Sequence, residues 1–437
     1  MPGLGPRHEN SGARCLGRRR VPGFLIFAWH PPNLLAKPGQ SWQSSYLYRY
    51  SHRLSWSCPP NSLTLAIENK RRKGAKLLDL TISNPTAVFP DYPHSQISNL
   101  YGRIESFAYE PEPTGKESAR IAIAEYHKRR DIEISPSQIL ITASTSEAYA
   151  SLFKLFCDVD GEVLVPVPSY PLFEYLASFE GVRSVPYRLL YDGSWFIDFA
   201  NLREHISDRT RAIVTVNPNN PTGSFLKNSE AMALADLARE HGLPVISDEV
   251  FMDYAFTADQ NRTSSFIGLD ATLSFSLNGL SKACGMPQMK LAWIAINGPE
   301  PEQALARQRL ELVLDAYLSV STPVQVALPG LFEIGEEIQH RIGRRTRGNR
   351  TRLQELLRDS PAQPLHLEGG WSAVIQLPKT WSEDEWVSRL LDECEVVVQP
   401  GYFFDMPGEP YIVVSLITPP DNFLEGIKRL RQLTAQC

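Results

Sequence analysis

The sequence predicts an α/β protein, with a large domain whose mostly parallel sheet is flanked by helices and a smaller α+β domain. Apolar runs typical of buried strands alternate with helical segments between residues 138 and 296. That alternation favours a sheet with helices on both faces. Beyond residue 298 long helical stretches are followed by short strands, which indicates a second unit.

The expected elements follow from apolar periodicity and from turn residues between the segments. A helix at 62–74, a strand at 77–82 and a helix at 115–130 come first. The large sheet is expected from strands 138–142, 162–167, 211–216, 243–247, 272–276 and 290–296, with helices 144–157, 170–179 and 229–241 between them. Helices 302–318, 323–334, 339–358 and 421–433 and strands 373–377, 396–398 and 411–416 complete the chain.

We divide the 437 residues into four parts, a length that suffices for two domains. Residues 1–55 are rich in arginine and lack periodicity, so we expect either a disordered extension or a start codon assigned too far upstream, with a targeting segment as the further alternative. Residues 56–100 are expected to join the small domain. The large domain covers 101–322 and the small C-terminal domain 323–437.

Composition narrows the functional classes. The net charge of −5 argues against a nucleic-acid surface, which needs a basic stripe. The six cysteines are scattered without the spacing of a zinc or redox site, so we expect no metal centre and a reduced, cytoplasmic location. The apolar stretch 21–29 is too short to span a membrane, and no membrane association is expected.

Three polar segments follow predicted strands in the large domain: Asn-Pro-Asn-Asn-Pro-Thr-Gly at 217–223, Ser-Asp-Glu-Val at 247–250 and Asn-Gly-Leu-Ser-Lys at 278–282. Asn220, Asp248 and Lys282 are separated by 28 and 34 residues. Ligands of such sheets bind at the carboxyl ends of the strands, where these side chains are expected. An amide, a carboxylate and an amine are what a protein needs to hold a pyridine aldehyde and condense with it.

Each residue of this set also has a purely structural interpretation. Lys282 alone would be a surface lysine, although burial beside another cation would make its amine a nucleophile. Asp248 could cap a turn or keep a pyridine nitrogen protonated. Asn220 could serve only the turn or could donate to a phenolate oxygen.

A phosphate site is predicted at the start of the helix at 144–157. Ser144, Thr145 and Ser146 offer hydroxyls and free backbone N–H groups there, although Ser144 and Glu147 also fit a capping box. Lys290 could add a cation that pairs with the phosphate. Tyr170 could stack on a flat cofactor or belong to the core.

Together these segments resemble the fold-type I pyridoxal-phosphate enzymes, specifically the class I/II aminotransferases related to aspartate aminotransferase. The resemblance extends from about Leu63 to Leu433. It implies that Lys282 forms the Schiff base with pyridoxal 5′-phosphate and moves a proton, while Asp248 pairs with the pyridinium nitrogen and Asn220 bonds O3′. It also implies that Ser144, Thr145 and Ser146 hold the phosphate and that Tyr170 stacks on the ring.

Tyr109 matches the tyrosine that reaches the phosphate of the neighbouring subunit in that family. The resemblance therefore implies a homodimer with shared active sites. Asn84, Tyr317 and Trp371 are expected to line the substrate pocket by analogy.

Four positions depart from the family pattern. Phe251 replaces a tyrosine that bonds O3′, and Lys290 replaces an arginine, which loses the bidentate fork. Gly279 replaces a serine, so one phosphate hydroxyl is missing or comes from Ser276 or Ser281. Val413 stands where an arginine clamps the substrate carboxylate, so another cation substitutes or the substrate lacks a carboxylate there.

The sequence thus predicts a cytoplasmic, homodimeric pyridoxal-phosphate aminotransferase that uses an amino acid or amine donor and a 2-oxo acid acceptor. A lyase, a decarboxylase or an enzyme like the cyclopropane-forming ACC synthase on the same fold is the first alternative. A non-catalytic ligand sensor is the second, although residues 1–55 show no helix-turn-helix pattern. A nicotinamide enzyme is disfavoured because no GxGxxG motif opens a βα unit.

Overall fold

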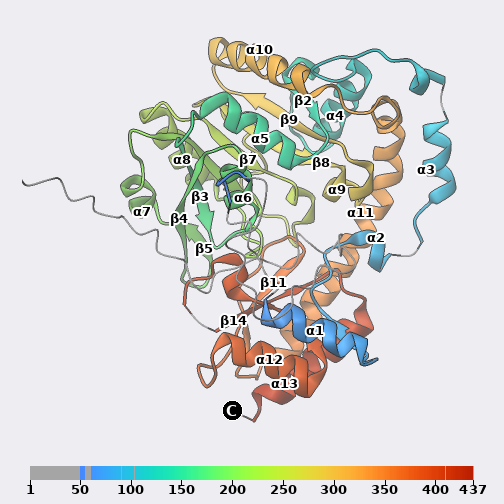
Figure 1. Cartoon of the computed structure of the whole chain (residues 1–437), viewed down its shortest axis with the longest axis vertical. Coiled ribbons are helices and arrows are strands. Elements are labelled where there is room, and N and C mark those ends of the chain that lie inside the picture. Colours follow the sequence, from blue (N-terminus) through green and yellow to red (C-terminus); the bar gives the residue numbers. More distant parts are fainter. Residues whose placement is uncertain (1–49, 55–60, 90, 103, 409, 437) are drawn as a thin grey trace, which may run out of the picture.

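The computed structural model describes residues 50–54, 61–89, 91–102, 104–408 and 410–436 (Figure 1). The expectation for the N-terminal extension concerns residues that lie almost entirely outside these ranges.

The large domain is built on an eight-stranded sheet with the strand order β2-β9-β8-β7-β6-β3-β4-β5. Neighbouring strands from β8 through β7, β6 and β3 to β4 run parallel, while β9 and β5 pair antiparallel with their neighbours. The predicted mostly parallel sheet is confirmed. The strands are β2 (Ile139–Thr142), β3 (Glu162–Val167), β4 (Arg183–Tyr191), β5 (Trp195–Ile197), β6 (Thr210–Val216), β7 (Val245–Asp248), β8 (Ser274–Gly279) and β9 (Ala292–Asn297).

Helices cover both faces of this sheet because its central strands are apolar on both sides (Figure 1). One face packs against α5 and α10, through residues such as Phe153 and Leu310. The opposite face packs against α8 through Leu234. The helices of this domain are α4 (Glu117–Lys128), α5 (Thr145–Phe156), α6 (Leu172–Phe179), α7 (Phe199–Glu204), α8 (Asn228–Glu240), α9 (Leu280–Ala283) and α10 (Glu300–Tyr317).

The smaller unit contains an antiparallel sheet of order β10-β11-β14-β13. In Figure 1 its strands and the helices α12 and α13 lie in the lower part of the molecule, next to α1 from the N-terminal side of the chain. The two-residue strand β1 also pairs there, in parallel with β12. The elements are α1 (Ser62–Arg72), β1 (Leu78–Asp79), β10 (Gln363–Pro364), β11 (Ser372–Gln376), α12 (Glu383–Cys394), β12 (Val396–Val397), β13 (Gln399–Pro400), β14 (Tyr411–Ser415) and α13 (Pro420–Thr434).

A single 36-residue helix, α11 (Thr322–Leu357), links the two units. The prediction of two helices with a break near residues 335–338 was wrong. Gly335 is a packing position rather than a break, since a Cβ there would lie 2.6 Å from the Cβ of Cys284 on the neighbouring α9 segment. The helix also continues through Pro329. The short helices α2 (Pro85–Val88) and α3 (His94–Tyr101), of which α3 packs against α11, precede the large domain.

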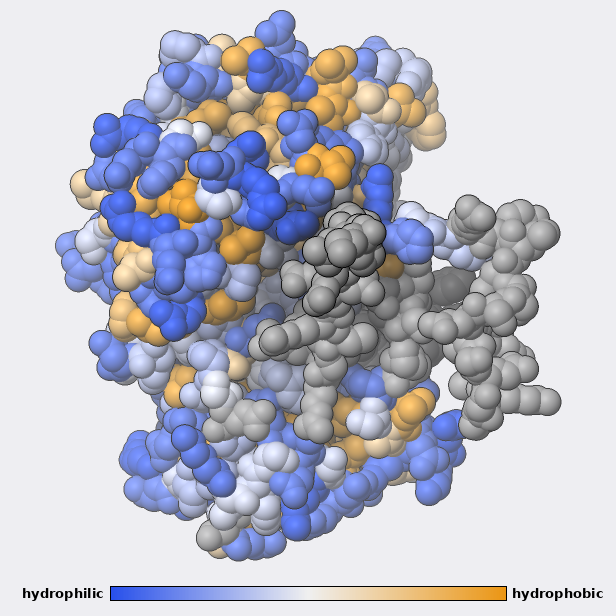
Figure 2. Space-filling view, turned by 60° about the vertical axis from the view of Figure 1, so that its left-hand side comes forward, coloured by the Kyte–Doolittle hydropathy of each residue, from blue (hydrophilic) through white to orange (hydrophobic). Residues whose placement is uncertain are grey.

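On the face shown in Figure 2, hydrophilic residues predominate and hydrophobic ones are interspersed among them. Within the described ranges no single helix is long and apolar enough to cross a membrane, and α10 with α11 meets that criterion only as a pair bent by 119°. Among the same residues no three His, Cys, Asp or Glu side chains are grouped as metal ligands would be.

Candidate active site

The three polar segments predicted from the sequence meet at one edge of the large sheet. Strands β6, β7 and β8 are parallel neighbours, and the register pairs Val216 with Asp248 and Asp248 with Leu277. Asn220 follows β6 by four residues, and Lys282 lies five residues after Leu277. Because the strands end together, their following loops share the carboxyl edge of the sheet.

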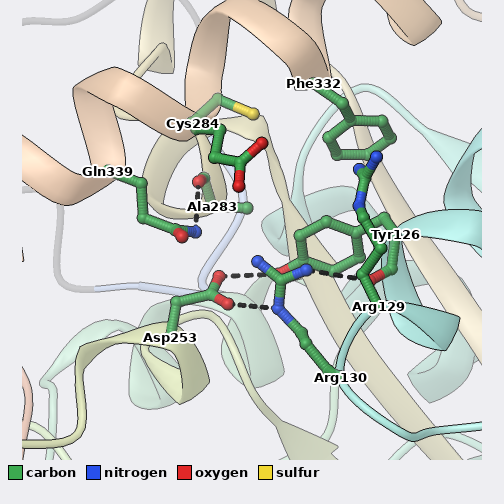
Figure 3. Close-up of a pocket in the computed structure, with 9 residues that line it drawn as sticks. Tyr126, Arg129, Arg130, Asp253, Ala283, Cys284, Phe332 and Gln339 are labelled. Atoms are coloured by element: carbon green, nitrogen blue, oxygen red, sulfur yellow. Dashed lines mark hydrogen bonds and ion pairs between the residues drawn. The ribbon is translucent and has the colours of Figure 1, made fainter.

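The short helix α9, which carries Lys282, is anchored through its carbonyl groups. The hydroxyl of Tyr254 donates to the Lys282 carbonyl at 2.6 Å, and the Gln339 amide donates to the Ala283 carbonyl at 2.8 Å. Figure 3 shows the contact between Gln339 and Ala283, which both line a pocket of about 270 Å³. These partners bind carbonyls at the end of the helix and so fix the backbone at and directly after the lysine.

The pocket of Figure 3 also contains a polar network that supports the 3-10 helix η3 (Met252–Tyr254), and so Tyr254. Asp253 accepts a hydrogen bond from Tyr126 at 2.7 Å and forms an ion pair with Arg130. The Arg130 guanidinium also lies over the Tyr126 ring. One carboxylate oxygen of Asp253 pairs with Arg130 and the other accepts from Tyr126, so both oxygens have partners. A carboxylate with both oxygens bound holds its segment rigidly.

The Lys282 amine lies in an aromatic environment. Its Nζ is 4.8 Å from the centre of the Trp371 ring and 5.5 Å from that of Phe251. Burial lowers the pKa of Lys282 to about 8, although the nearby Asp248 carboxylate opposes the shift. Roughly one molecule in ten then carries an uncharged amine at pH 7, far more than for a lysine in water.

Asp248 is held by two donors. The Tyr149 hydroxyl donates at 3.1 Å and the Val250 N–H at 3.2 Å. Burial raises the pKa of Asp248 to about 6, against these hydrogen bonds and the charge of Lys282. A positively charged nitrogen of a bound pyridine ring, placed next to the Asp248 carboxylate, would favour the ionised form of that carboxylate. Sequence reasoning missed Tyr149, whose position one turn into α5 gave only a weak signal.

The two adjacent asparagines have different roles. Asn219 is buried, and its amide is fully occupied by Pro168, Ser169 and Thr222. Asn220 is partly exposed, and within the described residues its side chain bonds only Ser372, whose hydroxyl donates to Oδ1 at 3.1 Å. The Asn220 amide nitrogen is therefore available to a ligand.

The start of α5 fits an anion. The Ser144 hydroxyl accepts from the Glu147 N–H at 3.1 Å, but the Glu147 carboxylate accepts from Ala143 at 2.5 Å. The predicted reciprocal capping box is therefore wrong, since it required the Ser144 N–H as that donor. In the described part of the chain, the backbone N–H groups of Thr145 and Ser146 have no hydrogen-bond partner. Tyr149 brings this helix start to the Asp248 edge.

The remaining predicted residues lie in varied environments. Tyr170 is half-buried against the core, and burial raises its pKa. Ser281 is half-buried on α9, whereas Lys290 is exposed with a left-handed backbone. Tyr109 is 79% exposed. Of the three pocket residues expected by analogy, Trp371 is buried beside Lys282, Tyr317 is 56% exposed and Asn84 caps α2.

Three of the four positions that depart from the family pattern lie in packed surroundings. A Cβ at Gly279 would lie 2.8 Å from that of Ala292, so strand β9 leaves no room for a serine. The Ser276 hydroxyl donates to the buried Glu249 carboxylate at 3.0 Å, which favours Ser281 as the source of a free hydroxyl. Phe251 packs edge-on against Trp371. Val413 is 1% exposed and packs in an apolar cluster with Phe404 and Met406.

The chain matches the family "aminotransferase class I and II" over residues 48–425. It is 29% identical to glutamate-pyruvate aminotransferase AlaA of Escherichia coli strain K12, over 66% of this chain and 72% of that one. Arginine–pyruvate transaminase AruH of Pseudomonas aeruginosa is 27% identical, with 83% and 91% covered.

Solved structures similar to this chain are also aminotransferases. Alanine aminotransferase from Pyrococcus furiosus superposes with a TM-score of 0.77 and 25% identity, over 86% of this chain and 96% of that one. An Escherichia coli aminotransferase superposes with a TM-score of 0.76 and the same identity, over 89% and 98%. The predicted fold class is confirmed, and the chain belongs to the class I and II aminotransferases, enzymes whose cofactor is pyridoxal 5′-phosphate.

Proposed function

We propose that this aminotransferase works as a cytoplasmic homodimer in which Lys282 binds the cofactor covalently and transfers the proton at the substrate α-carbon. The observation that carries the proposal is the place of the Lys282 amine, against the Trp371 and Phe251 rings at the sheet edge where the Asp248 strand ends. Burial there lowers the pKa of the amine to about 8. An amine that is often uncharged is both a nucleophile and a base. Reduced thiols at Cys157, Cys284 and Cys394 are compatible with a cytoplasmic location.

The chain's own residues fit pyridoxal phosphate. Asp248 would hold the ring nitrogen, and the free amide nitrogen of Asn220 would donate to O3′. When bound, the cofactor supplies an electron sink for the substrate α-carbon. Six further residues would complete the site: Ser144, Thr145, Ser146, Ser281 and Lys290 at the phosphate, and Tyr170 against the ring.

The neighbours of Lys282 would support proton transfer. Trp371 and Phe251 place ring faces against its amine, on sides that water cannot then occupy. The hydrogen bonds to the Lys282 and Ala283 carbonyls restrict the movement of the backbone to which the Lys282 side chain is attached. A base held at a fixed place and poorly hydrated transfers a proton with less reorganisation.

Compared with relatives that have a carboxylate-binding arginine, either another cation binds the substrate carboxylate in this protein or the substrate has no carboxylate at that place. Val413 is buried in an apolar cluster, so no cation is available at its position. Two relatives are named for pyruvate as a partner, which makes pyruvate the first 2-oxo acid to test. Amine donors without an α-carboxylate belong in the same screen, because they do not need the missing clamp.

We expect an amino donor added without acceptor to convert the bound cofactor to its amine form. The visible absorption band should disappear and should return when the matching 2-oxo acid is added. A spectroscopic screen of amino acids and amines against the cofactor-loaded protein measures this.

If the visible band does not disappear when a donor is added without acceptor, the result would favour a lyase. A relative that is 31% identical over 49% of this chain, S-alkyl-thiohydroximate lyase SUR1 of Arabidopsis thaliana, makes that alternative concrete. A lyase would turn over a substrate repeatedly without acceptor and without accumulating the amine form.

The proposed domain division places the cofactor site in residues 101–322. Residues 56–100 would join the small domain at 323–437, a placement supported by the pairing of β1 with β12. Lys282 and Asp248 would then come from the large domain and Trp371 from the small one.

An exposed aromatic patch supports the homodimer. Phe107 and Tyr109 are each 79% exposed, and Tyr317 and Leu318 are 56% and 68% exposed. The two segments are joined by a 2.9 Å hydrogen bond from the Ser319 hydroxyl to the Glu112 carbonyl. Large apolar side chains grouped on a surface are typical of a protein interface.

We expect sedimentation to give twice the chain mass, and Leu318→Glu to shift the protein toward the monomer. Tyr109→Phe should leave the dimer intact but weaken cofactor binding several-fold, because the proposed phosphate contact crosses the interface. A wild-type monomer with full cofactor affinity would contradict this arrangement.

A further inference from the structure

The Asn220 amide has two chemically different ends, and the structure engages only one of them. Its Oδ1 accepts the hydroxyl hydrogen of Ser372, while its Nδ2 has no partner among the described residues. A hydroxyl can serve either end of an amide, but a phenolate oxygen can only accept. With such an oxygen at Nδ2, the amide must keep Oδ1 toward Ser372.

Ser372 belongs to the other domain but is fixed against the loop that carries Asn220. It is the first residue of β11, directly after the turn at residues 368–371. The Gly369 N–H of that turn donates to the Gly223 carbonyl at 2.9 Å, and the Gly370 N–H donates to the Tyr254 carbonyl at 3.0 Å. The loop and the turn therefore hold each other in place.

Close backbone contact explains two glycines at this junction. Gly223 has a φ of +66°, and a Cβ on it would collide with Leu367 and the Gly369 carbonyl. A Cβ on Gly369 would lie 2.7 Å from the Tyr254 carbonyl oxygen. The two segments therefore pack without intervening side chains, which leaves Ser372 little freedom to move away from Asn220.

A buried carboxylate secures the same turn. The Glu368 side chain is 5% exposed and accepts from the Phe225 N–H and from Arg262, each at 3.0 Å. It also forms an ion pair with Lys227. All three partners belong to the large domain, so the charge fixes the turn to the domain that carries Asn220.

We propose that Ser372 is a positioning residue that orients the Asn220 amide toward the cofactor and polarises it, which rests on the proposed role of Asn220. A donor at Oδ1 makes the amide N–H groups stronger donors, as in any hydrogen-bond chain. The Asn220 donor then stabilises negative charge on the phenolate oxygen. Loss of this donor should raise the pKa at which the cofactor bound to Lys282 gives up its proton.

The test is a spectrophotometric pH titration of the visible band in the cofactor-loaded protein. In Ser372→Ala the pKa of that band should rise by about half a unit, and cofactor dissociation should increase several-fold. Ser372→Thr keeps the hydroxyl and should restore both values. Asn220→Ala should shift the pKa in the same direction, and adding Ser372→Ala to it should change little further.

Ser415→Ala is the matched control. Ser415 pairs with Ser372 in the sheet register, but its hydroxyl donates to the Ile82 carbonyl at 2.6 Å. This variant loses a hydroxyl from the same sheet and should titrate like the wild type, whatever its thermal stability.

Two outcomes would overturn the inference: an unchanged titration in Ser372→Ala while Asn220→Ala shifts, or equal shifts in Ser372→Ala and Ser415→Ala. Neither affects the assignment of Lys282. A wild-type protein that takes up no cofactor on Lys282 would instead contradict the proposed function, and this inference with it.

Discussion

Replacing Lys282 with alanine should abolish the visible band of the cofactor-loaded protein and lower transamination on the order of 10⁴-fold or more. The variant loses both the amine that bonds the cofactor and the base that moves the α-proton. Its backbone contacts to Tyr254 remain, because they use the carbonyl group. We therefore expect Lys282→Ala to fold normally, as measured by thermal unfolding.

Lys290→Ala is the matched control for that variant. Lys290 is an exposed lysine eight residues further along the chain. This variant should keep the visible band and lose only cofactor affinity, through a weaker phosphate contact. A Lys282→Ala protein that still binds the cofactor covalently would contradict the assignment.

Asp248→Asn should have opposite effects on activity and on stability. Activity should fall on the order of a hundredfold to a thousandfold, because a neutral amide cannot hold the ring nitrogen protonated. The cofactor-free protein should become more stable at pH 8 by up to about 3 kcal/mol, since burial makes the ionised carboxylate unfavourable. Steady-state kinetics and chemical unfolding measure the two effects.

The stability gain should depend on pH in a defined way. The pKa of Asp248 is raised from 3.8 to about 6, so the folded protein binds this proton more tightly than the unfolded chain. The unfavourable contribution is complete above about pH 6, declines as the pH falls, and is absent below the unfolded value near 4. Equal gains at pH 8 and pH 4, or a loss at pH 8, would contradict the burial argument.

The meeting of the three polar segments at one edge of the sheet was predictable because it depends on where strands end. Asn220, Asp248 and Lys282 each follow an apolar strand, and parallel neighbours bring such positions to one edge. The spacing of polar residues after strands is local information that the sequence carries. The same reasoning predicted the helix start at Ser144.

The partners of these residues were not predictable, because they come from distant segments. Tyr149 lies 99 residues before Asp248, and Ser372 lies 152 residues after Asn220. Neither contact leaves a periodic pattern, since each depends on how the packed units meet. Glu368 was missed for the same reason.

The structural role of two glycines could not be told from the sequence. Gly335 directly follows the predicted end of a helix at residue 334, yet it allows α11 to approach Cys284 closely. Gly279 looked like a lost phosphate ligand, yet strand β9 excludes a side chain there. In both places the need for glycine comes from a neighbour distant in sequence, which propensity cannot reveal.

Borohydride reduction of the cofactor-loaded protein, followed by digestion and mass spectrometry, tests the central claim most directly. Reduction fixes the cofactor to the lysine that holds it. We predict a pyridoxyl group on the peptide that contains Lys282 and on no other lysine. A label on Lys290 or elsewhere, or no label on protein that shows the visible band, would contradict the account.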